Sequence, residues 1–390
     1  MINILQTPNE INAAYGINAI TLTGITIVQR RYRLEIWNDD ETALYASLII
    51  TPNAYGNGVA DIQNVLQTLI QPSPYNIEKI VSINNSFYET KQYIIKAVEV
   101  DLNDEPIDED EYVSEGPYLT IGARKDPWSV NFTVPTKALS DYDYTINADS
   151  ILYKPTIGNG VKIKLVSINE NDYYTLSYKN TFTSYTIYPY ADDVALTTIT
   201  ITNSLTAVYP NIFITLPVGP LNLGGQLPNN TTKYFVKVNS DWWLFTINDE
   251  CDTFNPIQLS WQNSYGFRDY YTFRKRDDKR TTVSRNTFNK SIIDYNDVAV
   301  MTTRGEGGQT IYSQKIETEY TIRTDYLDDK ESLFFENLIM SANVRAKING
   351  VWYNILLTRN EWRIQRYITD KMFQFEVSFK IAANQKSQRG

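Results

Sequence analysis

Carboxylates are the side chains of this sequence that could do chemistry, because the chain has 45 acidic residues and no histidine. A suitably spaced pair of Asp or Glu can hydrolyse a glycosidic bond, but no pair stands out here. Without histidine there is no Ser-His-Asp or Cys-His arrangement. The one cysteine, Cys251, cannot build a structural zinc site or an internal disulfide. We therefore expect no enzyme activity, and a carboxylate-based glycosidase is a minor alternative.

Cofactor motifs are also missing from the sequence. It has no G-x-x-x-x-G-K-[ST] and no strand-linked G-x-G-x-x-G, so no cradle for nucleotide phosphates is indicated. The glycine-rich run at 305–308 lacks the Lys and Ser/Thr of such a cradle and is typical of a turn between strands. We expect no cofactor and no metal.

Two clusters of charge stand out. Residues 101–115 carry eight acids and no basic residue, whereas residues 268–290 carry eight basic groups against three acids. The acidic run is predicted to be a solvated loop. It does not fit a calcium loop, which needs Gly at position 6 and Glu at position 12, where Pro106 and Tyr112 stand. An acidic finger that docks on a basic neighbouring subunit is the alternative.

Three explanations compete for the basic segment: a solvated hairpin tip, a contact with an acidic neighbouring subunit, and a contact with DNA. Tyr271 and Phe273 alternate with polar residues as core-facing strand residues would, so they do not predict a base-stacking platform. The net charge of −9 argues against broad nucleic-acid binding. The candidate subunit interface consists of Asp108, Glu109, Asp110, Glu111, Arg274, Lys275, Arg276, Lys279 and Arg280.

The elements that must position these charges are mostly strands. Aromatic residues make up 13% of the chain, with many Ile, Thr and Val, which suit a pleated sheet. Tyr32, Leu34 and Ile36 alternate with charged residues, and the stretch 373–381 alternates strictly between apolar and polar. The sequence predicts a mainly β fold, with β-sandwich or barrel-like domains and a few short helices packed on the sheets.

Two helices are expected among the strands. Apolar residues recur at helical spacing after Asp61, until Pro72 and Pro74 end the pattern. Asp328 can cap a second helix, with Glu331 three residues further on. We interpret both apolar stripes as core.

The predicted organisation has three domains: an N-terminal β domain with one short helix (1–125), a middle β-sandwich-like domain (126–250) and a C-terminal α+β domain (251–390). The first twenty residues lack the basic region of a signal peptide. No apolar run approaches the roughly 18 residues of a transmembrane helix. We expect synthesis in a cytoplasm and no membrane contact.

Several segments resemble virion proteins of phages that infect Bacteroidetes, including crAss-like and flavobacterial phages. The stretch Pro52–Gln67, directly after the predicted hairpin, resembles a pattern of these proteins. The run from Cys251 through Ile257–Gly266 to Asp269–Phe273 is similar to their cysteine, tryptophan and aromatic signature. Further similar segments follow in the same order: Tyr320–Ile322, Asp325–Leu327, the helix after Asp328, and Asp370–Phe375.

The middle of the chain matches the family weakly, and Phe267 stands where a second glycine often follows Gly266. The resemblance implies a structural subunit of a phage tail or neck, made in the host bacterial cytoplasm and located in the virion, without an assigned catalytic residue. Copies in a ring and neighbouring tail, neck or portal-proximal proteins would be its partners, with genomic DNA at most passing through. A receptor-binding or glycan-binding protein at the tail tip is the alternative, in which Trp242 and Trp243 could stack on sugar rings.

Overall fold

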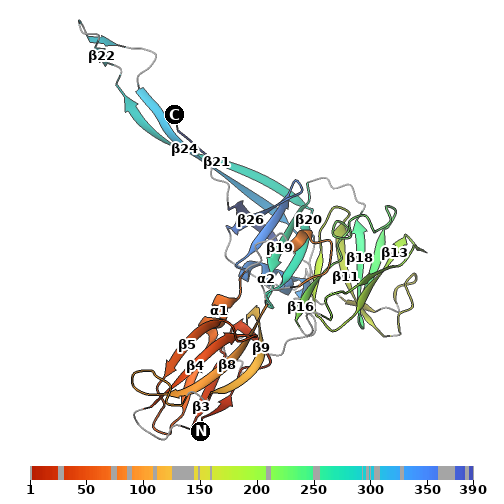
Figure 1. Cartoon of the computed structure of the whole chain (residues 1–390). Coiled ribbons are helices and arrows are strands. Elements are labelled where there is room, and N and C mark those ends of the chain that lie inside the picture. Colours follow the sequence, from red (N-terminus) through yellow and green to blue (C-terminus); the bar gives the residue numbers. More distant parts are fainter. Residues whose placement is uncertain are drawn as a thin grey trace. The chain divides into compact units, whose positions relative to one another are not determined.

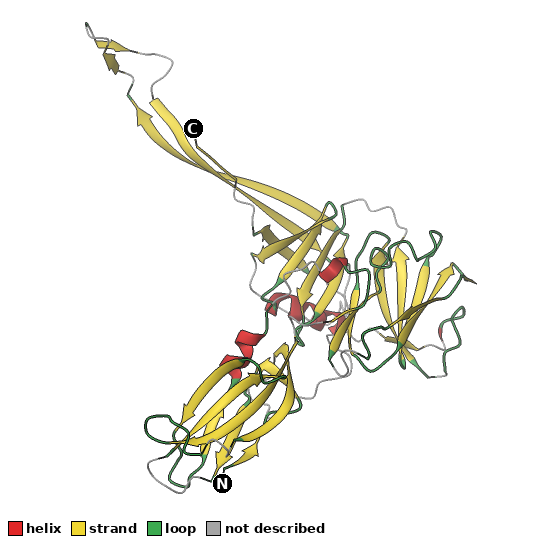
Figure 2. Cartoon of the chain, viewed as in Figure 1, coloured by secondary structure: helices red, strands yellow, loops and turns green. Residues whose placement is uncertain are grey.

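The computed structural model describes residues 2–24, 30–71, 77–85, 90–108, 112–124, 145–147, 150–158, 160–207, 212–248, 255–291, 293–295, 298, 300–302, 308–325, 329–358, 374–382 and 386–389. Of the residues described, 57% lie in strands and 6% in helices (Figures 1 and 2). This confirms the mainly β fold with few short helices.

By compactness the chain divides into two units. The first contains Met1–Glu250, Ser260–Tyr270 and Leu333–Ala342. The second contains Cys251–Leu259, Tyr271–Ser332 and Asn343–Gly390. The three-domain division stays a prediction, because its boundaries near 125 and 250 fall outside the described residues.

The first unit begins with a β-sandwich. Its strands are β1 (Asn3–Gln6), β2 (Ile11–Tyr15), β3 (Ala19–Thr23), β4 (Arg31–Asn38), β5 (Leu44–Ile50), β6 (Gly58–Asp61), β8 (Thr90–Val100) and β9 (Val113–Arg124). One sheet has the order β2-β9-β8-β4-β5, and the other has the order β1-β3-β6. Tyr32, Leu34 and Ile36 of β4 lie in the core between the sheets, which confirms the predicted inward face of this strand.

A short helix, α1 (Gln63–Leu69), closes this core. Ile62 and Leu66 are fully buried, so the apolar stripe is core, as predicted. The helix begins two residues after the predicted start, because Asp61 still belongs to β6. The Asp61 carboxylate instead accepts a hydrogen bond from the Gln63 amide at 3.0 Å and so assists the helix start from outside.

A second sandwich follows in the same unit. Its strands are β7 (Asn84–Asn85), β10 (Thr145–Asn147), β11 (Lys162–Asn169), β12 (Thr175–Lys179), β13 (Ser184–Ala191), β14 (Val194–Ala195), β15 (Ile199–Thr202), β16 (Phe213–Pro217), β17 (Lys233–Val238) and β18 (Asp241–Asn248). The larger sheet has the order β10-β11-β18-β17-β13-β14, with β15 also on β13, and the smaller one the order β12-β16-β7. Between them, the Tyr234 and Phe245 rings stack at 4.9 Å.

The segment 77–85 joins the two sandwiches. It contains the 3-10 helix η1 (Ile77–Lys79) and β7, which pairs with β16 of the second sandwich. Asn222, which is fully buried, donates hydrogen bonds to the carbonyls of Glu78 at 2.6 Å and Ile80 at 2.8 Å. The two sandwiches are therefore linked by backbone pairing and by a buried amide.

The remaining strands form an eight-stranded sheet. They are β19 (Ile257–Gln262), β20 (Arg268–Phe273), β21 (Arg276–Lys290), β24 (Gly308–Arg323), β25 (Val344–Ile348), β26 (Val351–Leu357), β27 (Glu376–Ile381) and β28 (Lys386–Arg389). The order is β20-β19-β25-β26-β27-β24-β21, and β28 pairs with β24. A separate two-stranded ribbon consists of β22 (Ile293–Tyr295) and β23 (Val300–Thr302).

The second helix is α2 (Asp329–Met340). Phe334, Phe335 and Leu338 are buried, which confirms the core interpretation of its apolar stripe. Trp261 packs edge-on against Phe334, with ring centroids 4.8 Å apart. The predicted capping residue, Asp328, lies outside the described residues.

The alternating stretch 373–381 is a strand only from Glu376. Val377 and Phe379 are buried as predicted, but Ser378 on the opposite face is buried too. The reason is position, because β27 lies between β26 and β24 rather than at an edge. Strict alternation therefore did not mean one solvent-exposed face here.

Candidate subunit interface

The most extended element of the second unit is the hairpin of β21 and β24. The two strands pair in antiparallel register from Arg276 opposite Arg323 to Lys290 opposite Gly308. One residue, Tyr312, is extra, because Asn286 pairs with Ser313 and Thr287 with Ile311. In Figure 1 the hairpin runs on beyond the other long strands of its own sheet. We call residues 281–290 and 308–318, which lie past the last pair between β24 and β27, the arm.

The base of the hairpin is packed and the arm is not. At the base, Tyr320 and Ile322 are buried, and the Tyr320 ring stacks on Phe379 of β27 at 5.4 Å. Along the arm, every residue of β21 from 281 to 290 is exposed. A two-stranded ribbon has no second layer to cover its faces, so this exposure follows from its geometry.

Apolar side chains nonetheless continue along the arm. Val283, Phe288, Ile311 and Tyr312 are 37–49% exposed. Phe288 and Tyr312 contact each other edge to face, with ring centroids 6.2 Å apart. In the two-stranded ribbon beyond, Ile293 is 58% exposed. A run of exposed apolar residues on one element is typical of a surface that binds another molecule.

The described basic residues lie in β20, in the connection at 274–275 and along β21, rather than together at one hairpin tip, and the three explanations stay open. Arg268 is not part of the surface at all, because it is buried in β20. Lys275 forms an ion pair with Asp325 at 3.3 Å. Arg274, which precedes it, is half-buried.

The other predicted interface cations lie in β21 itself. The Lys279 ammonium stands over the Tyr320 ring, 5.7 Å from its centroid. Arg280 is exposed and lies opposite Glu319 in the backbone register. The backbone of Arg276 pairs with that of Arg323. The cations of β21 thus begin at the packed base and continue, with Arg285 and Lys290, along the arm.

Most of the described part of the acidic segment is an exposed loop, as predicted, but Asp101 is half-buried, residues 113–115 belong to β9, and the loop is anchored on its own sandwich. The Asp101 carboxylate accepts hydrogen bonds from the amides of Asn103 at 2.7 Å and Glu105 at 3.0 Å. These bonds, with the Arg31 guanidinium nearby, hold the pKa of Asp101 below its ordinary value. Arg31 of β4 also forms an ion pair with Asp104 at 2.8 Å. Two of these acids are thus engaged within the chain.

The acids of the candidate interface lie just beyond this turn. Asp108 is exposed, and Glu109, Asp110 and Glu111 lie outside the described residues. Asp108 belongs to the first unit and the cations of β21 to the second. The pairing of the two clusters across a subunit boundary stays a prediction.

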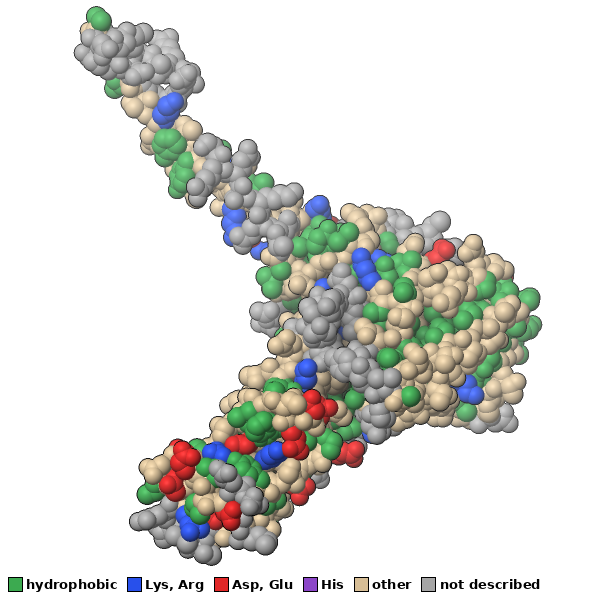
Figure 3. Space-filling view, viewed as in Figure 1, with side chains coloured by type: hydrophobic (Ala, Val, Ile, Leu, Met, Phe, Trp, Pro, Cys, Tyr) green, Lys and Arg blue, Asp and Glu red, His purple; other side chains and the backbone are tan. Residues whose placement is uncertain are grey.

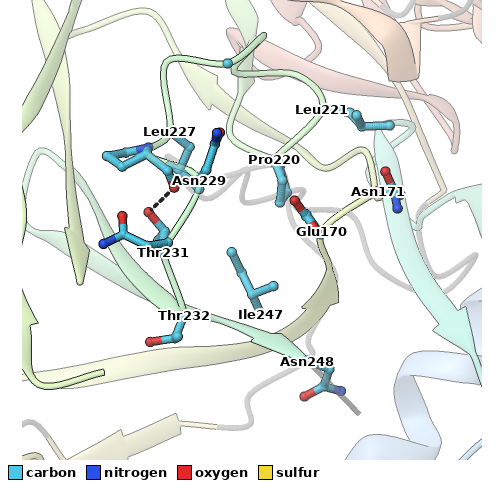
Figure 4. A pocket seen from close by; sticks show the side chains of 13 residues that line it. Glu170, Asn171, Pro220, Leu221, Leu227, Asn229, Thr231, Thr232, Ile247 and Asn248 are labelled. Carbon is cyan, nitrogen blue, oxygen red and sulfur yellow. Dashed lines mark hydrogen bonds between the residues drawn. The ribbon is translucent and has the colours of Figure 1, made fainter. Parts of the chain in front are cut away.

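The second sandwich has a polar cavity of about 340 Å³ (Figure 4). Amide and hydroxyl side chains line it together with the apolar side chains of Ile247 and Leu227, and none of the thirteen lining residues is aromatic. The Thr231 hydroxyl donates a hydrogen bond to the Pro228 carbonyl at 2.7 Å, which fixes one wall. The rest of the lining consists of Glu170, Asn171, Pro220, Leu221, Gly225, Asn229, Asn230, Thr232 and Asn248.

Trp242 and Trp243 do not belong to this cavity. Both are buried in β18, with 6% and 3% exposure. The Trp243 indole donates a hydrogen bond to the Tyr178 hydroxyl at 2.9 Å. Stacking of these two rings on a sugar is therefore excluded, and both are core residues.

Two of the segments on which the expected family resemblance rests form specific turns. In one, the Asn263 side-chain oxygen accepts hydrogen bonds from the amides of Tyr265 at 3.0 Å and Phe267 at 3.1 Å. Gly266 has a φ of +88°, and an added Cβ would lie 2.5 Å from the Gly122 carbonyl carbon. Glycine at 266 is thus required by conformation and by space.

The stretch Pro52–Gln67 has an analogous turn. The Asn53 side-chain oxygen accepts hydrogen bonds from the amides of Tyr55 at 2.9 Å and Asn57 at 3.0 Å. Tyr55 itself is 89% exposed. The hydrogen bonds of the turn account for an asparagine at position 53. Burial does not account for a tyrosine at position 55, because its side chain is exposed.

Comparison of the chain with protein families and with curated proteins found no match. None of the helices in the described ranges is long and apolar enough to cross a membrane.

Proposed function

We propose that the chain is a structural subunit of a bacteriophage tail or neck, which assembles as a homo-oligomeric ring and contacts other virion proteins. The observation that carries this proposal is the arm: a long ribbon without a core of its own, on which apolar and cationic side chains are exposed together. The family resemblance given above supplies the setting, and the proposal includes no catalytic role.

The physical reason lies in what the arm lacks. An isolated two-stranded ribbon is at best marginally stable in water. Only part of the arm has a third strand, where β28 pairs with Ser313–Ile316 of β24. Phe288, Ile311 and Tyr312 lie beyond that third strand and remain half-exposed. A neighbouring subunit would supply the missing layer, and burial of these side chains would favour assembly.

Shortening the arm tests the assembly role. Asn286 and Ser313 pair across the hairpin, so an Asn-Gly turn can replace residues 287–312 without changing the register or the partner of β28. We expect the full chain to form a defined oligomer in light scattering and native mass spectrometry, and the shortened chain to remain a folded monomer. An oligomer of unchanged size after shortening would remove the main support for the proposal.

Immunogold electron microscopy of purified particles tests the location. Antibody raised against this chain should label the neck or the tail of particles from an infected culture. Label confined to the distal tip would favour receptor binding. If intact and opened particles carried no label and their mass spectrum lacked the protein, the virion role would be wrong.

A glycan-binding role at the tail tip is the second candidate, and the polar cavity of the second sandwich is the observation that favours it. Its amide and hydroxyl groups suit the hydroxyls of a sugar, although the cavity lacks an aromatic platform. A glycan array with the isolated protein checks this role. Binding that is lost in Asn230→Ala and retained in Arg285→Ala, on the arm, would support it.

A further inference from the structure

The first sandwich has an apolar edge. β5 is the last strand of its sheet, and Leu44, Tyr45 and Ile49 on it are 37–46% exposed. The loop and the strand that follow expose Tyr55 and Val59, by 89% and 63%. We call residues 44–59 the edge segment. These side chains come from three consecutive pieces of chain at one side of the sandwich, and none of them is buried by the described residues of this chain.

Acidic residues lie in the turn just before the edge segment. Asp39 and Asp40 are exposed in the turn that leads into β5. Hydrogen bonds from Thr42 hold the pKa of Asp40 below its ordinary value, so this carboxylate stays charged down to low pH. The chain up to residue 124 contains seventeen acids and seven basic residues. In the view of Figure 3, most of the acidic side chains lie over this sandwich, with basic ones among them, and further basic side chains lie along the arm.

The arm is rich in basic rather than acidic residues, and its exposed part is similar in length to β5. β21 is the last strand of its sheet, and it contains five basic residues and two acids. From Val283 to Lys290 it offers eight exposed residues, against the seven residues of β5. Each element therefore ends a sheet and exposes apolar side chains. The basic residues lie in β21 itself, whereas β5 has no charged residue and follows the acidic turn at 39–41.

We propose that the arm of one copy docks along β5 of a second copy, so that β21 and β5 extend one sheet and the exposed apolar residues of the arm cover the edge segment. The inference rests on the proposed homo-oligomer and names its contact. Pairing of two end strands uses their outward backbone groups, and side chains then set specificity. Opposite charges favour this pairing over arm to arm or edge to edge.

The contact joins two different surfaces of the chain. Each copy would give its arm to one neighbour and receive an arm from another, which is a head-to-tail arrangement. Such contacts close into a ring where the rotation between copies allows it. The head-to-tail arrangement would also account for two end strands in one chain, because β5 and β21 of each copy would pair with different neighbours.

Photo-crosslinking tests the contact without assuming a register. A benzoylphenylalanine at position 288 of the full chain, in a mixture of ¹⁴N- and ¹⁵N-labelled protein, should give inter-chain cross-links to peptides within 39–61. Cross-links of an intact oligomer to other segments would overturn the docking site and leave the proposed function standing. A chain that stays monomeric at all concentrations and gives no inter-chain product would count against both.

Charge exchange tests the pairing by a second route. We expect Arg285→Glu and Asp39→Lys each to weaken self-association several-fold in sedimentation velocity, and the double variant to recover most of the loss. Glu10→Lys is the matched control, because Glu10 is exposed beside β2, at the other end of the same sheet. Losses that simply add in the double variant, or an equal loss in the control, would overturn the proposed partner surface.

Discussion

In the first unit, individual residues such as the buried Asn222 and the tightly packed Gly266 hold separate segments of the chain together. Asn222 holds three segments at once, because it also accepts a hydrogen bond from the Tyr174 amide at 2.6 Å, in addition to the two bonds that it donates. No periodicity or composition in the sequence singles out this residue. Its role depends on segments about 50 and 140 residues away, which only the fold brings together.

Replacement of Asn222 should therefore be costly. In Asn222→Ala one buried and two partly buried hydrogen bonds to the backbone are lost, and we expect the free energy of unfolding to fall by about 2–4 kcal/mol. Urea denaturation followed by fluorescence measures this change. Asn229→Ala, an exposed position in the same loop region, should change it by less than about 0.5 kcal/mol. Equal losses for both variants would contradict the role of Asn222 as a joint.

Gly266 permits a test in which backbone strain and steric clash are separated. Gly266→Ala would place a Cβ 2.5 Å from the Gly122 backbone in a residue with positive φ. Gly225→Ala is the control, because Gly225 has a similar φ of +82° and open space around it. We expect strain of about 1 kcal/mol in the control to lower the melting temperature slightly, and Gly266→Ala to lower the melting temperature clearly more. Matching shifts would mean that the contact with Gly122 is unimportant.

At the scale of elements, patterns within one segment predicted which side chains are buried. They did not predict which strands pair with each other. The inward face of β4 and the apolar stripes of α1 and α2 follow from spacing within one segment, and all were confirmed. The arm was missed because residues 276–323 show no sustained alternation that would mark two long strands. A ribbon exposed on both faces leaves no apolar period in its sequence. The sequence therefore revealed the cluster of basic residues but not the long hairpin of β21 and β24 to which most of them belong.

An ion-pair cluster attaches the arm to the sheet. Glu317 of β24 contacts Lys315 at 2.6 Å and Lys380 of β27 at 2.8 Å, and hydrogen bonds from the two ammonium groups lower its pKa to about 2. A lowered pKa stabilises the fold above the ordinary pKa of 4.5, and this contribution is lost as the pH falls from about 4.5 through 2.

Titration of the Glu317 carboxylate by NMR measures this effect directly. We expect an apparent pKa near 2 in the intact chain and a rise part of the way toward 4.5 in Lys380→Met, which removes the ion pair from Glu317 to β27 and leaves the backbone pairing of β24 and β27 intact. Lys315→Met, a variant within the same strand as Glu317, should raise the pKa and leave the attachment to β27 in place. A carboxylate that titrates at its ordinary pKa in the intact chain would contradict the cluster.

At the scale of the whole molecule, charge is divided unevenly along the chain, and assembly should depend on salt. The Debye length falls from about 10 Å at 0.1 M salt to about 3 Å at 1 M. If opposite charges guide the arm to its partner surface, the association constant should fall as salt increases. Sedimentation velocity over this range measures it. Phe288→Ser should weaken association at every salt concentration, whereas Arg285→Glu should also flatten the salt dependence. Association that strengthens with salt would indicate an apolar contact alone.

The order of strands in the eight-stranded sheet has a consequence for synthesis. β27 lies between β26 and β24, yet a ribosome makes it after both of them. When β21 and β24 have left the ribosome, β27, which pairs with the base of their hairpin, has not yet been made. The hairpin itself is made of local pairs and can form early, but its anchoring must wait for translation to pass residue 381. Under the proposed contact between arm and edge segment, a chain without this strand would lack an anchored arm, so assembly would favour subunits whose translation has passed residue 381.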